Sequence, residues 1–265
     1  MKCNYTGLPA PAWWLVLLLG TACSSSSNPI ATSPEPQVTL PALPTGRIAI
    51  VGASVSAGFG GTPFGEVFTV AASRSAVESE ANVFLFRDPI GDSHAQIDKA
   101  IAFKATAIVA LDFLFWDLYG STEPAWRDKA LAAGLAELER ARAAGAWILV
   151  GDVPRVVTAA EWMLPPDSVP DVATLARYNQ HIRVWASRER VLFVPFASWA
   201  EPLAADGDVE LADGTKMPAR SLVALDGLHL NALGVWALLD RLDHFIEARL
   251  PGTPKDALVF VRPQP

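Results

Sequence analysis

Short runs of consecutive apolar residues recur along this chain, and longer segments with apolar positions at helical spacing lie between them. Runs of this length without polar alternation indicate strands that are buried on both faces, as in a parallel sheet. The five runs are Ile48–Val51, Asn82–Phe86, Thr106–Leu111, Trp147–Val150 and Val191–Val194.

The segments between the runs predict helices over Glu123–Ala144, Asp171–Ser187 and Asn231–Leu250. This alternation predicts a single α/β domain, a three-layer α/β/α sandwich around a five-stranded parallel sheet with the flavodoxin-like order 2-1-3-4-5. A small hairpin is expected over Val209–Met217, with its turn at Asp213-Gly214.

The predicted strand order also indicates where a site would form. Open α/β sheets bind ligands beyond the carboxyl ends of their strands, where the strand order reverses. In the order 2-1-3-4-5 that point lies between strands 1 and 3. Ser54 follows the first predicted strand and Asp112 follows the third, so we expect these two residues to lie close together.

The N-terminal segment has the pattern of an export signal. Lys2 is followed by the apolar run Ala12–Leu19, which is about half the length that spans a bilayer. Small residues lead from this run to Cys23, and the arrangement resembles a bacterial lipoprotein signal. The resemblance implies that residues 1–22 are removed and that Cys23 is lipidated. An ordinary secretory signal cut elsewhere, or an uncleaved anchor, is the alternative.

Residues 23–45 are rich in serine and proline, with four consecutive serines and five prolines. Such a segment buries too little apolar surface to fold alone, so we expect a lipidated cysteine followed by a disordered tether. Residues 46–265 would then form the folded domain. The expected location is the cell envelope, outside the cytoplasm, with the domain held to a membrane by its lipid anchor. Ser24 is compatible with the outer membrane where the host has one.

Composition excludes some classes of function. The formal net charge is −7 and the isoelectric point is near 5.1, and no lysine- or arginine-rich run occurs, so a nucleic acid is not an expected partner. The chain has two cysteines and four scattered histidines without metal-ligand spacing, so neither a metal site nor a cofactor is expected.

Two polar segments carry the candidate chemistry. Gly52–Gly58 follows the first predicted strand and contains Ser54, and the segment before the last predicted helix sets Asp226 three residues ahead of His229. A serine hydroxyl becomes an effective nucleophile near neutral pH when a histidine accepts its proton, and a carboxylate orients that histidine. These three residues therefore indicate nucleophilic catalysis.

The same segments resemble the conserved blocks of the SGNH (GDSL-type) hydrolase superfamily. Gly52-Ala-Ser-Val-Ser-Ala-Gly58 is similar to the family's G-D-S-x-S-x-G block, with Ala53 in place of the aspartate, and Asp226-Gly-Leu-His229 is similar to its D-x-x-H block. The resemblance implies that Ser54 is the nucleophile, His229 the general base and Asp226 its orienting group, and that the enzyme needs no cofactor.

The resemblance also implies donors that stabilise an oxyanion. They are the Ser54 N–H, a backbone N–H after the second strand, where Gly91 or His94 aligns, and a side chain after the third strand. That last place holds Asp112 instead of the family's asparagine. An ionised carboxylate there would repel the developing charge. It could donate if protonated, or it could point away. Ser93 is an alternative nucleophile.

We therefore expect a lipid-anchored serine esterase that acts through an acyl-enzyme on small acyl esters, with the O-acetyl groups of envelope glycans among the candidate substrates. One alternative is a catalytically impaired envelope lipoprotein that serves as a binding module. Another is an acyltransferase to envelope glycans, which shares the acyl-enzyme. Neither the substrate nor the oligomeric state follows from the sequence.

Overall fold

The computed structural model describes residues 41–211 and 213–263. The predicted signal peptide, Cys23 and most of the predicted tether lie outside the described residues, so those expectations remain predictions. Among the described helices, none combines the length and the hydrophobicity that crossing a bilayer requires.

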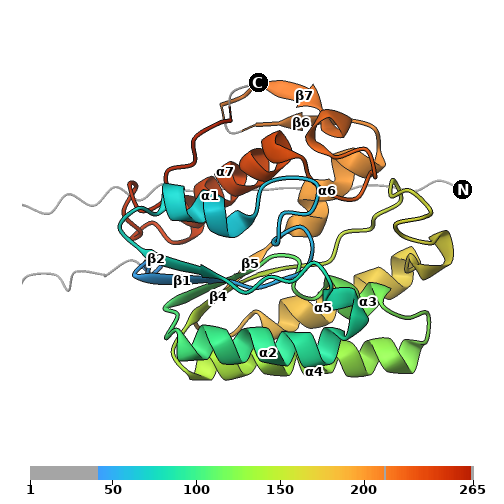
Figure 1. The fold of residues 1–265 in the computed structure, drawn as a ribbon, viewed down its shortest axis with the longest axis horizontal. Helices are drawn as coiled ribbons and strands as arrows, with labels where there is room; N and C mark the ends of the chain where they lie inside the picture. The colour runs from blue at the N-terminus through green and yellow to red at the C-terminus, as the bar shows by residue number, and fades with distance from the viewer. Residues whose placement is uncertain (1–40, 212, 264–265) are drawn as a thin grey trace, which may run out of the picture. The chain divides into compact units, whose positions relative to one another are not determined.

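A five-stranded sheet, with every pair of neighbouring strands parallel, forms the middle layer (Figure 1), and its order is β2-β1-β3-β4-β5. The predicted three-layer architecture and the order 2-1-3-4-5 are confirmed. The strands are β1 (Arg47–Ile50), β2 (Ala76–Ser79), β3 (Ala107–Ala110), β4 (Trp147–Gly151) and β5 (Val191–Val194).

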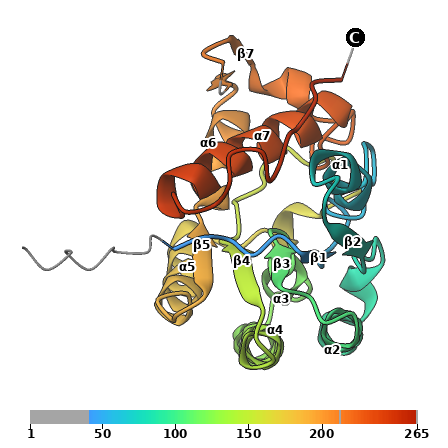
Figure 2. The same cartoon turned by 90° about the vertical axis from the view of Figure 1, so that its left-hand side faces the viewer.

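Helices cover both faces of the sheet, as Figure 2 shows along the edge of the layers. One face carries α1 (Phe64–Ala71), α6 (Phe196–Ala204) and α7 (Ala232–Arg249). The opposite face carries α2 (Pro89–Ala102), α3 (Phe115–Tyr119), α4 (Pro124–Ala143) and α5 (Val172–Trp185). Three short 3-10 helices lie in the loops: Leu85–Arg87, Pro166–Ser168 and Ala219–Leu222.

The predicted hairpin is also present. Strand β6 (Asp208–Glu210) pairs antiparallel with β7 (Lys216–Pro218), between α6 and α7 in the chain. The observed bounds of α4 and α5 lie within two residues of the predicted ones. The third expected helix, α7, begins one residue after Asn231.

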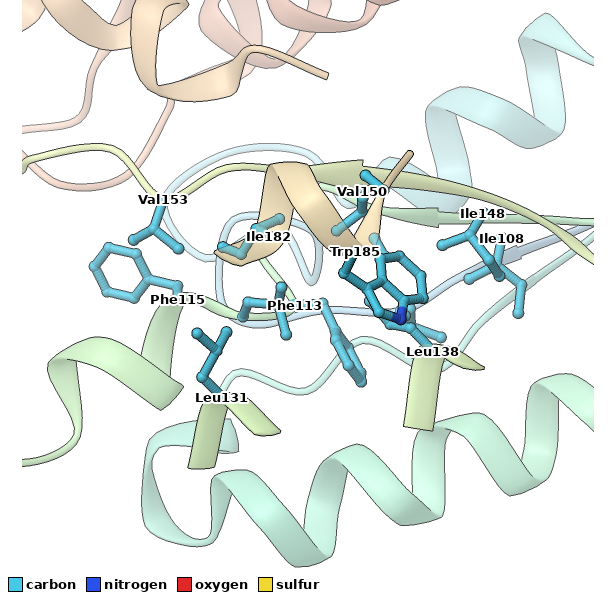
Figure 3. Close-up of a cluster of buried hydrophobic side chains, with 14 of the residues drawn as sticks. Ile108, Phe113, Phe115, Leu131, Leu138, Ile148, Val150, Val153, Ile182 and Trp185 are labelled. Atoms are coloured by element: carbon cyan, nitrogen blue, oxygen red, sulfur yellow. The ribbon is translucent and has the colours of Figure 1, made fainter. Parts of the chain in front are cut away.

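Alternate residues of each central strand enter opposite cores. Ile48 and Ile50 pack with α1 and α7, whereas Ala49 and Val51 pack with the helices of the other face. Figure 3 shows the latter core, where side chains of β3 and β4 meet those of α4 and α5. A strand that is buried on both faces needs apolar residues at every position, which is why the strands read as continuous apolar runs.

Side-chain caps fix where three helices begin. Asp88, Asp171 and Asn231 each accept a hydrogen bond from the backbone N–H three residues later, at the starts of α2, α5 and α7. Such a cap satisfies one of the N–H groups that a helix leaves unpaired at its first turn. The cap at Asn231 starts α7 three residues after His229.

The second strand corrects a prediction. The sequence predicts it over Asn82–Phe86, but β2 is Ala76–Ser79, and the predicted segment forms a turn and the start of a 3-10 helix. β2 is an edge strand whose residues are mostly exposed, so its sequence is too polar to look like a buried strand. Phe84 and Phe86 are apolar yet exposed, which produced the misleading pattern.

The folded part also begins earlier than residue 46. Leu43 is buried, and its N–H donates to Thr253 Oγ1 at 2.8 Å. The carbonyl of Pro41 accepts from the N–H of Gly252 at 3.0 Å. Residues 41–45, predicted as tether, therefore pack against the segment that follows α7.

Candidate active site

Four of the predicted site residues converge at the carboxyl edge of the sheet. Ser54 lies on the turn that follows β1, and Asp112 lies just after β3, the neighbouring strand. The loop that carries Asp226 and His229 reaches the same edge from the start of α7. Three separate parts of the chain thus meet at one point.

A continuous hydrogen-bonded series joins the three candidate catalytic residues. His229 Nε2 lies 2.8 Å from Ser54 Oγ, and His229 Nδ1 lies 2.8 Å from Asp226 Oδ2. His229 and Asp226 are 2% and 7% exposed. The nucleophile, base and orienting carboxylate expected from the sequence are therefore brought together in the geometry that their chemistry requires.

One carboxyl oxygen of Asp226 accepts hydrogen bonds from the backbone, and the other faces the imidazole of His229. Its Oδ1 accepts from the N–H of Leu228 and of His229, each at 2.9 Å. Burial alone would raise the pKa of Asp226, but the hydrogen bonds from the backbone and side chain of His229 and from Leu228 outweigh it and hold the pKa below its usual value. Asp226 is thus ionised at neutral pH and suited to stabilise a charged imidazole.

Hydrogen bonds from the loop after β4 hold the segment that contains Asp226 and His229. The Asp226 carbonyl accepts from the N–H of Ala160 at 2.8 Å, and the Gly227 carbonyl accepts from Thr158 Oγ1 at 2.8 Å. Gly227 has a φ of 65°, and a Cβ on it would lie 2.1 Å from the Thr158 carbonyl oxygen. Glycine is therefore required here both for the backbone conformation and for the close approach of the two loops.

Asp112 holds the turn that carries the nucleophile. Its Oδ2 accepts from the N–H of Val55 at 3.0 Å and of Ser56 at 3.1 Å, and its Oδ1 accepts from Ser56 Oγ at 2.6 Å. Gly52 allows this approach, because a Cβ there would lie 2.1 Å from Asp112 Oδ1. Both carboxyl oxygens are thus occupied by the turn, which corrects the expectation that Asp112 stands as an oxyanion donor.

The pKa of Asp112 is raised, in contrast to that of Asp226. Asp112 is 5% exposed, and its burial raises the pKa more than the hydrogen bonds from Ser56, Ala53 and Val55 lower it. These hydrogen bonds come from neutral donors and offset only part of the loss of hydration. Asp112, in the place of the family's asparagine, therefore carries a buried carboxyl that accepts hydrogen bonds from the backbone.

Gly91, Ser93 and His94 do not join the site. They lie within α2, where the Gly91 N–H donates to the capping carboxylate of Asp88 at 3.0 Å and the His94 N–H faces the preceding turn of the helix. The His94 side chain contacts Glu137 at 2.9 Å, and Ser93 Oγ is buried without a hydrogen-bond partner among the described residues. The predictions for Gly91 and His94 as oxyanion donors, and for Ser93 as a nucleophile paired with a base, are corrected. The misplaced second strand caused the predictions for Gly91 and His94.

Val83 is the residue that the sequence reasoning missed. It follows the true β2 and lines a cavity together with Ser54. Its neighbours' N–H groups are occupied, Asn82 donating to the Gly52 carbonyl at 3.0 Å and Phe84 to Asn82 Oδ1 at 2.9 Å. The N–H groups of Ser54 and Val83 have no acceptor among residues 41–211 and 213–263. The position of β2 was the signal needed to find Val83.

Two cavities meet at Ser54. The first, here called the aromatic cleft, has a volume of about 340 Å³ and is lined by Phe59, Phe84, Phe86, Trp116, Trp162 and His229. The second, here called the apolar groove, has a volume of about 110 Å³ and lies between α6 and α7, with walls that include Trp199, Leu203, Gly234, Leu238 and Arg241. No group of three or more histidines, cysteines or acidic residues in the described part of the chain is placed to hold a metal ion.

Comparisons with known proteins agree with this fold. No family model matches the sequence, and no curated protein does. An acetylxylan esterase from Geobacillus stearothermophilus superposes with a TM-score of 0.51 at 13% identity, covering 78% of this chain and 96% of that one. A protein described as an acylhydrolase, from Bacteroides fragilis, superposes with a TM-score of 0.50 at 14% identity, covering 78% and 92%. Both are SGNH hydrolases, and at these identities the likeness shows the fold: the chain has the three-layer SGNH-hydrolase architecture.

Proposed function

We propose that this chain is an SGNH-type serine esterase that hydrolyses acyl esters through an acyl-enzyme. The observation that carries the proposal is the position of His229, which bridges Ser54 Oγ and Asp226 Oδ2 with two contacts of 2.8 Å. The SGNH fold and the two cavities that open beside Ser54 support it.

The reaction follows from these contacts. His229 Nε2 accepts the Ser54 proton while Oγ forms a bond to the ester carbonyl carbon, which gives a tetrahedral intermediate with a negatively charged oxygen. The carbonyl forms again as the bond to the alcohol oxygen breaks, and the alcohol leaves with the proton from His229. A water molecule, deprotonated by His229, then attacks the acyl-enzyme; the bond to Ser54 Oγ breaks, His229 returns the proton to that oxygen, and the acid leaves. Asp226 stabilises the charged imidazole in both halves of the cycle.

The oxyanion needs donors other than Asp112. The N–H groups of Ser54 and Val83 are the candidates, because each is free of an acceptor among the described residues and each residue lines the cleft beside Ser54 Oγ. One well-placed donor contributes about 3 kcal/mol to transition-state stabilisation. Two backbone donors would therefore supply much of the catalysis without the asparagine side chain that the family uses.

The test is hydrolysis of a short-chain aryl ester by the full chain. We expect turnover by the wild type and a loss of roughly 10³ or more in kcat for Ser54→Ala and for His229→Ala. The matched control is His94→Ala, which removes an exposed histidine outside the site. Retention of activity in Ser54→Ala, together with its loss in Ser93→Ala, would overturn the assignment of the nucleophile.

The location is a separate proposal. We propose that Cys23 is lipidated and tethers the esterase to the cell envelope outside the cytoplasm, because a short apolar run and small residues precede it. The full chain should then partition with membranes, and Cys23→Ser should abolish incorporation of a labelled fatty acid. A mature N-terminus at another residue, as measured by mass spectrometry, would contradict it.

A non-catalytic binding module is the second candidate, and the buried carboxyl of Asp112 beside Ser54 favours it. Such a module would bind an acyl ester specifically and would not hydrolyse it. Transfer of the acyl group to a sugar hydroxyl would use the same acyl-enzyme, with the sugar in place of water. The appearance of an acylated sugar when a glycan is added to the assay would identify that activity.

A further inference from the structure

Two neighbouring helices each give one face to the apolar groove, and its other walls come from the turn after β1, the segment after β3, the loop after β4 and the segment before α7. The lining residues on the two helices recur three and four positions apart, which places them on a single face of each helix. On α6 they are Phe196, Trp199, Ala200, Leu203 and Ala204, and on α7 they are Gly234, Ala237, Leu238 and Arg241.

The dimensions of the groove suit a chain of several carbons. The seven-residue separation of Gly234 and Arg241 along α7 corresponds to about 10 Å at the rise of an α-helix. The volume of about 110 Å³ compares with roughly 150 Å³ for an engineered apolar cavity that binds benzene. An acetyl group, with a single methyl beyond its carbonyl, would leave most of this space unused.

Arg241 and Trp199 both line the groove, and the guanidinium carbon of Arg241 lies 5.1 Å from the centre of the Trp199 ring. A stacked arginine covers apolar surface with its aliphatic stem while its charged head reaches water. The pair therefore adds apolar surface to the wall of the groove.

The position of His229 decides which cavity takes which half of an ester. His229 lines the aromatic cleft and does not line the apolar groove, whereas Ser54 lines both. In the acylation step the leaving alcohol oxygen must receive its proton from the base, so the alcohol must lie on the side of the histidine. The acyl group then extends from the attacked carbon to the other side, into the groove.

We propose that the apolar groove between α6 and α7 binds the acyl chain of the substrate and that the aromatic cleft binds its alcohol portion. The preferred substrates are therefore esters of acids several carbons longer than acetate. This proposal rests on the esterase function proposed above and names the substrate class of the same site.

The aromatic cleft suits an alcohol portion with a flat or weakly polar face. Among its lining residues Trp162 is 76% exposed, and Phe84 and Phe86 are about half exposed. The rings of Phe86 and Trp116 lie 5.6 Å apart. Exposed aromatic faces stack on apolar or ring-shaped groups, so the cleft provides contact area that depends on the alcohol and not on the acyl chain.

The first experiment measures kcat/KM for a series of 4-nitrophenyl esters from acetyl to dodecanoyl with the full chain. We expect kcat/KM to rise roughly fourfold for each added methylene until the groove is filled, the factor that corresponds to about 0.8 kcal/mol per buried methylene. It should then level off or fall. A maximum at acetyl would overturn the proposal while leaving the esterase function intact. No turnover at any length would overturn both.

Variants in the groove locate the effect. Ala200→Phe fills the groove and should lower the ratio of octanoyl to acetyl kcat/KM by tenfold or more. Leu203→Ala enlarges it and should move the optimum to a longer chain, so the proposal is tested even if one variant fails to fold. Ala248→Phe, on the exposed side of α7, is the matched control and should leave the profile as in the wild type.

A variant in the cleft separates the two cavities. Trp162→Ala removes contact area for the alcohol, so it should raise KM while the relative rates along the acyl series stay the same. The proposal is overturned if Trp162→Ala shifts the acyl-chain optimum, or if neither Ala200→Phe nor Leu203→Ala does.

Discussion

Two buried aspartates beside the proposed nucleophile have nearly the same hydrogen bonds and opposite electrostatics. Asp226 accepts from two consecutive backbone N–H groups and from the side chain of His229, and Asp112 accepts from two consecutive backbone N–H groups and from the side chain of Ser56. The pKa of Asp226 is lowered, whereas that of Asp112 is raised.

The difference lies in the balance between burial and hydrogen bonding. Burial raises the pKa of both carboxyls, but at Asp226 the hydrogen bonds from His229 and Leu228 outweigh it, whereas at Asp112 the loss of hydration outweighs the hydrogen bonds. Similar hydrogen bonds therefore orient an imidazole at one position and fix a backbone turn at the other.

The largest effect should come from Asp226→Asn. This change keeps the shape of the loop but replaces the anion that orients and stabilises the charged His229, so we expect kcat to fall by roughly 10³ to 10⁴. The measurement is steady-state hydrolysis of an aryl ester at neutral pH. Asp208→Asn, in the exposed strand β6, is the matched control. A loss smaller than tenfold would mean that Asp226 does not act through His229.

The next effect should come from Asp112→Ala. It leaves the N–H groups of Val55 and Ser56 without their acceptor, and each buried unpaired group costs about 1–3 kcal/mol. We expect the free energy of unfolding to fall by roughly 2–5 kcal/mol, as measured by urea denaturation. An unchanged midpoint of unfolding would show that the turn is held by other contacts.

Asp117 extends the comparison to a carboxyl with no partner. It is 1% exposed, its Oδ2 has no hydrogen bond among the described residues, and burial raises its pKa well above the usual value. Because the folded-state pKa lies above the unfolded one, the contribution of Asp117 to stability is present below the unfolded pKa and is lost as pH rises through the folded pKa.

Asp117→Asn should therefore be more stable than the wild type at pH 8, by about 1–3 kcal/mol, the cost of an unsatisfied buried group. The advantage should shrink toward pH 4. Denaturation midpoints at several pH values measure it. An advantage that stays constant with pH would show that Asp117 does not titrate in this range.

The smallest change in activity should come from Asp112→Asn, and the direction of that change is the informative result. The amide oxygen can still accept from Val55 and Ser56, and the amide NH₂ can donate to Ser56 Oγ, so the turn is preserved. Asp112 lines the groove that opens at Ser54, so replacing a group that can ionise with a neutral amide should raise kcat at neutral pH by about tenfold, less than the roughly 10² that one added oxyanion donor brings. A loss of activity would reveal a positive role for the carboxylate.

The sequence predicted most of the fold because the central strands are buried on both faces and therefore read as unbroken apolar runs. It failed at β2, an edge strand whose exposed residues Glu78 and Ser79 carry no such signal. That one error moved the predicted oxyanion donor from the turn at Val83 to Gly91 and His94, which lie in a helix.

The candidate catalytic residues were easier to predict than their surroundings. Ser54, Asp226 and His229 lie in short motifs that resemble the blocks of the SGNH hydrolases, and the structure brings them within hydrogen-bond distance of one another. The contact of Asp112 with the turn at Val55 and Ser56, and the groove between α6 and α7, depend on residues far apart in the chain. Only the folded arrangement defines such features.

The central claim is that His229 activates Ser54 as a nucleophile, and the most direct measurement is covalent labelling by a fluorophosphonate followed by peptide mapping. We predict a single modification on Ser54 in the wild type and in Ser93→Ala, and none in Ser54→Ala or His229→Ala. Prior incubation with an octanoyl ester analogue should slow the labelling. The absence of labelling in the wild type, or a label on Ser93, would contradict the account.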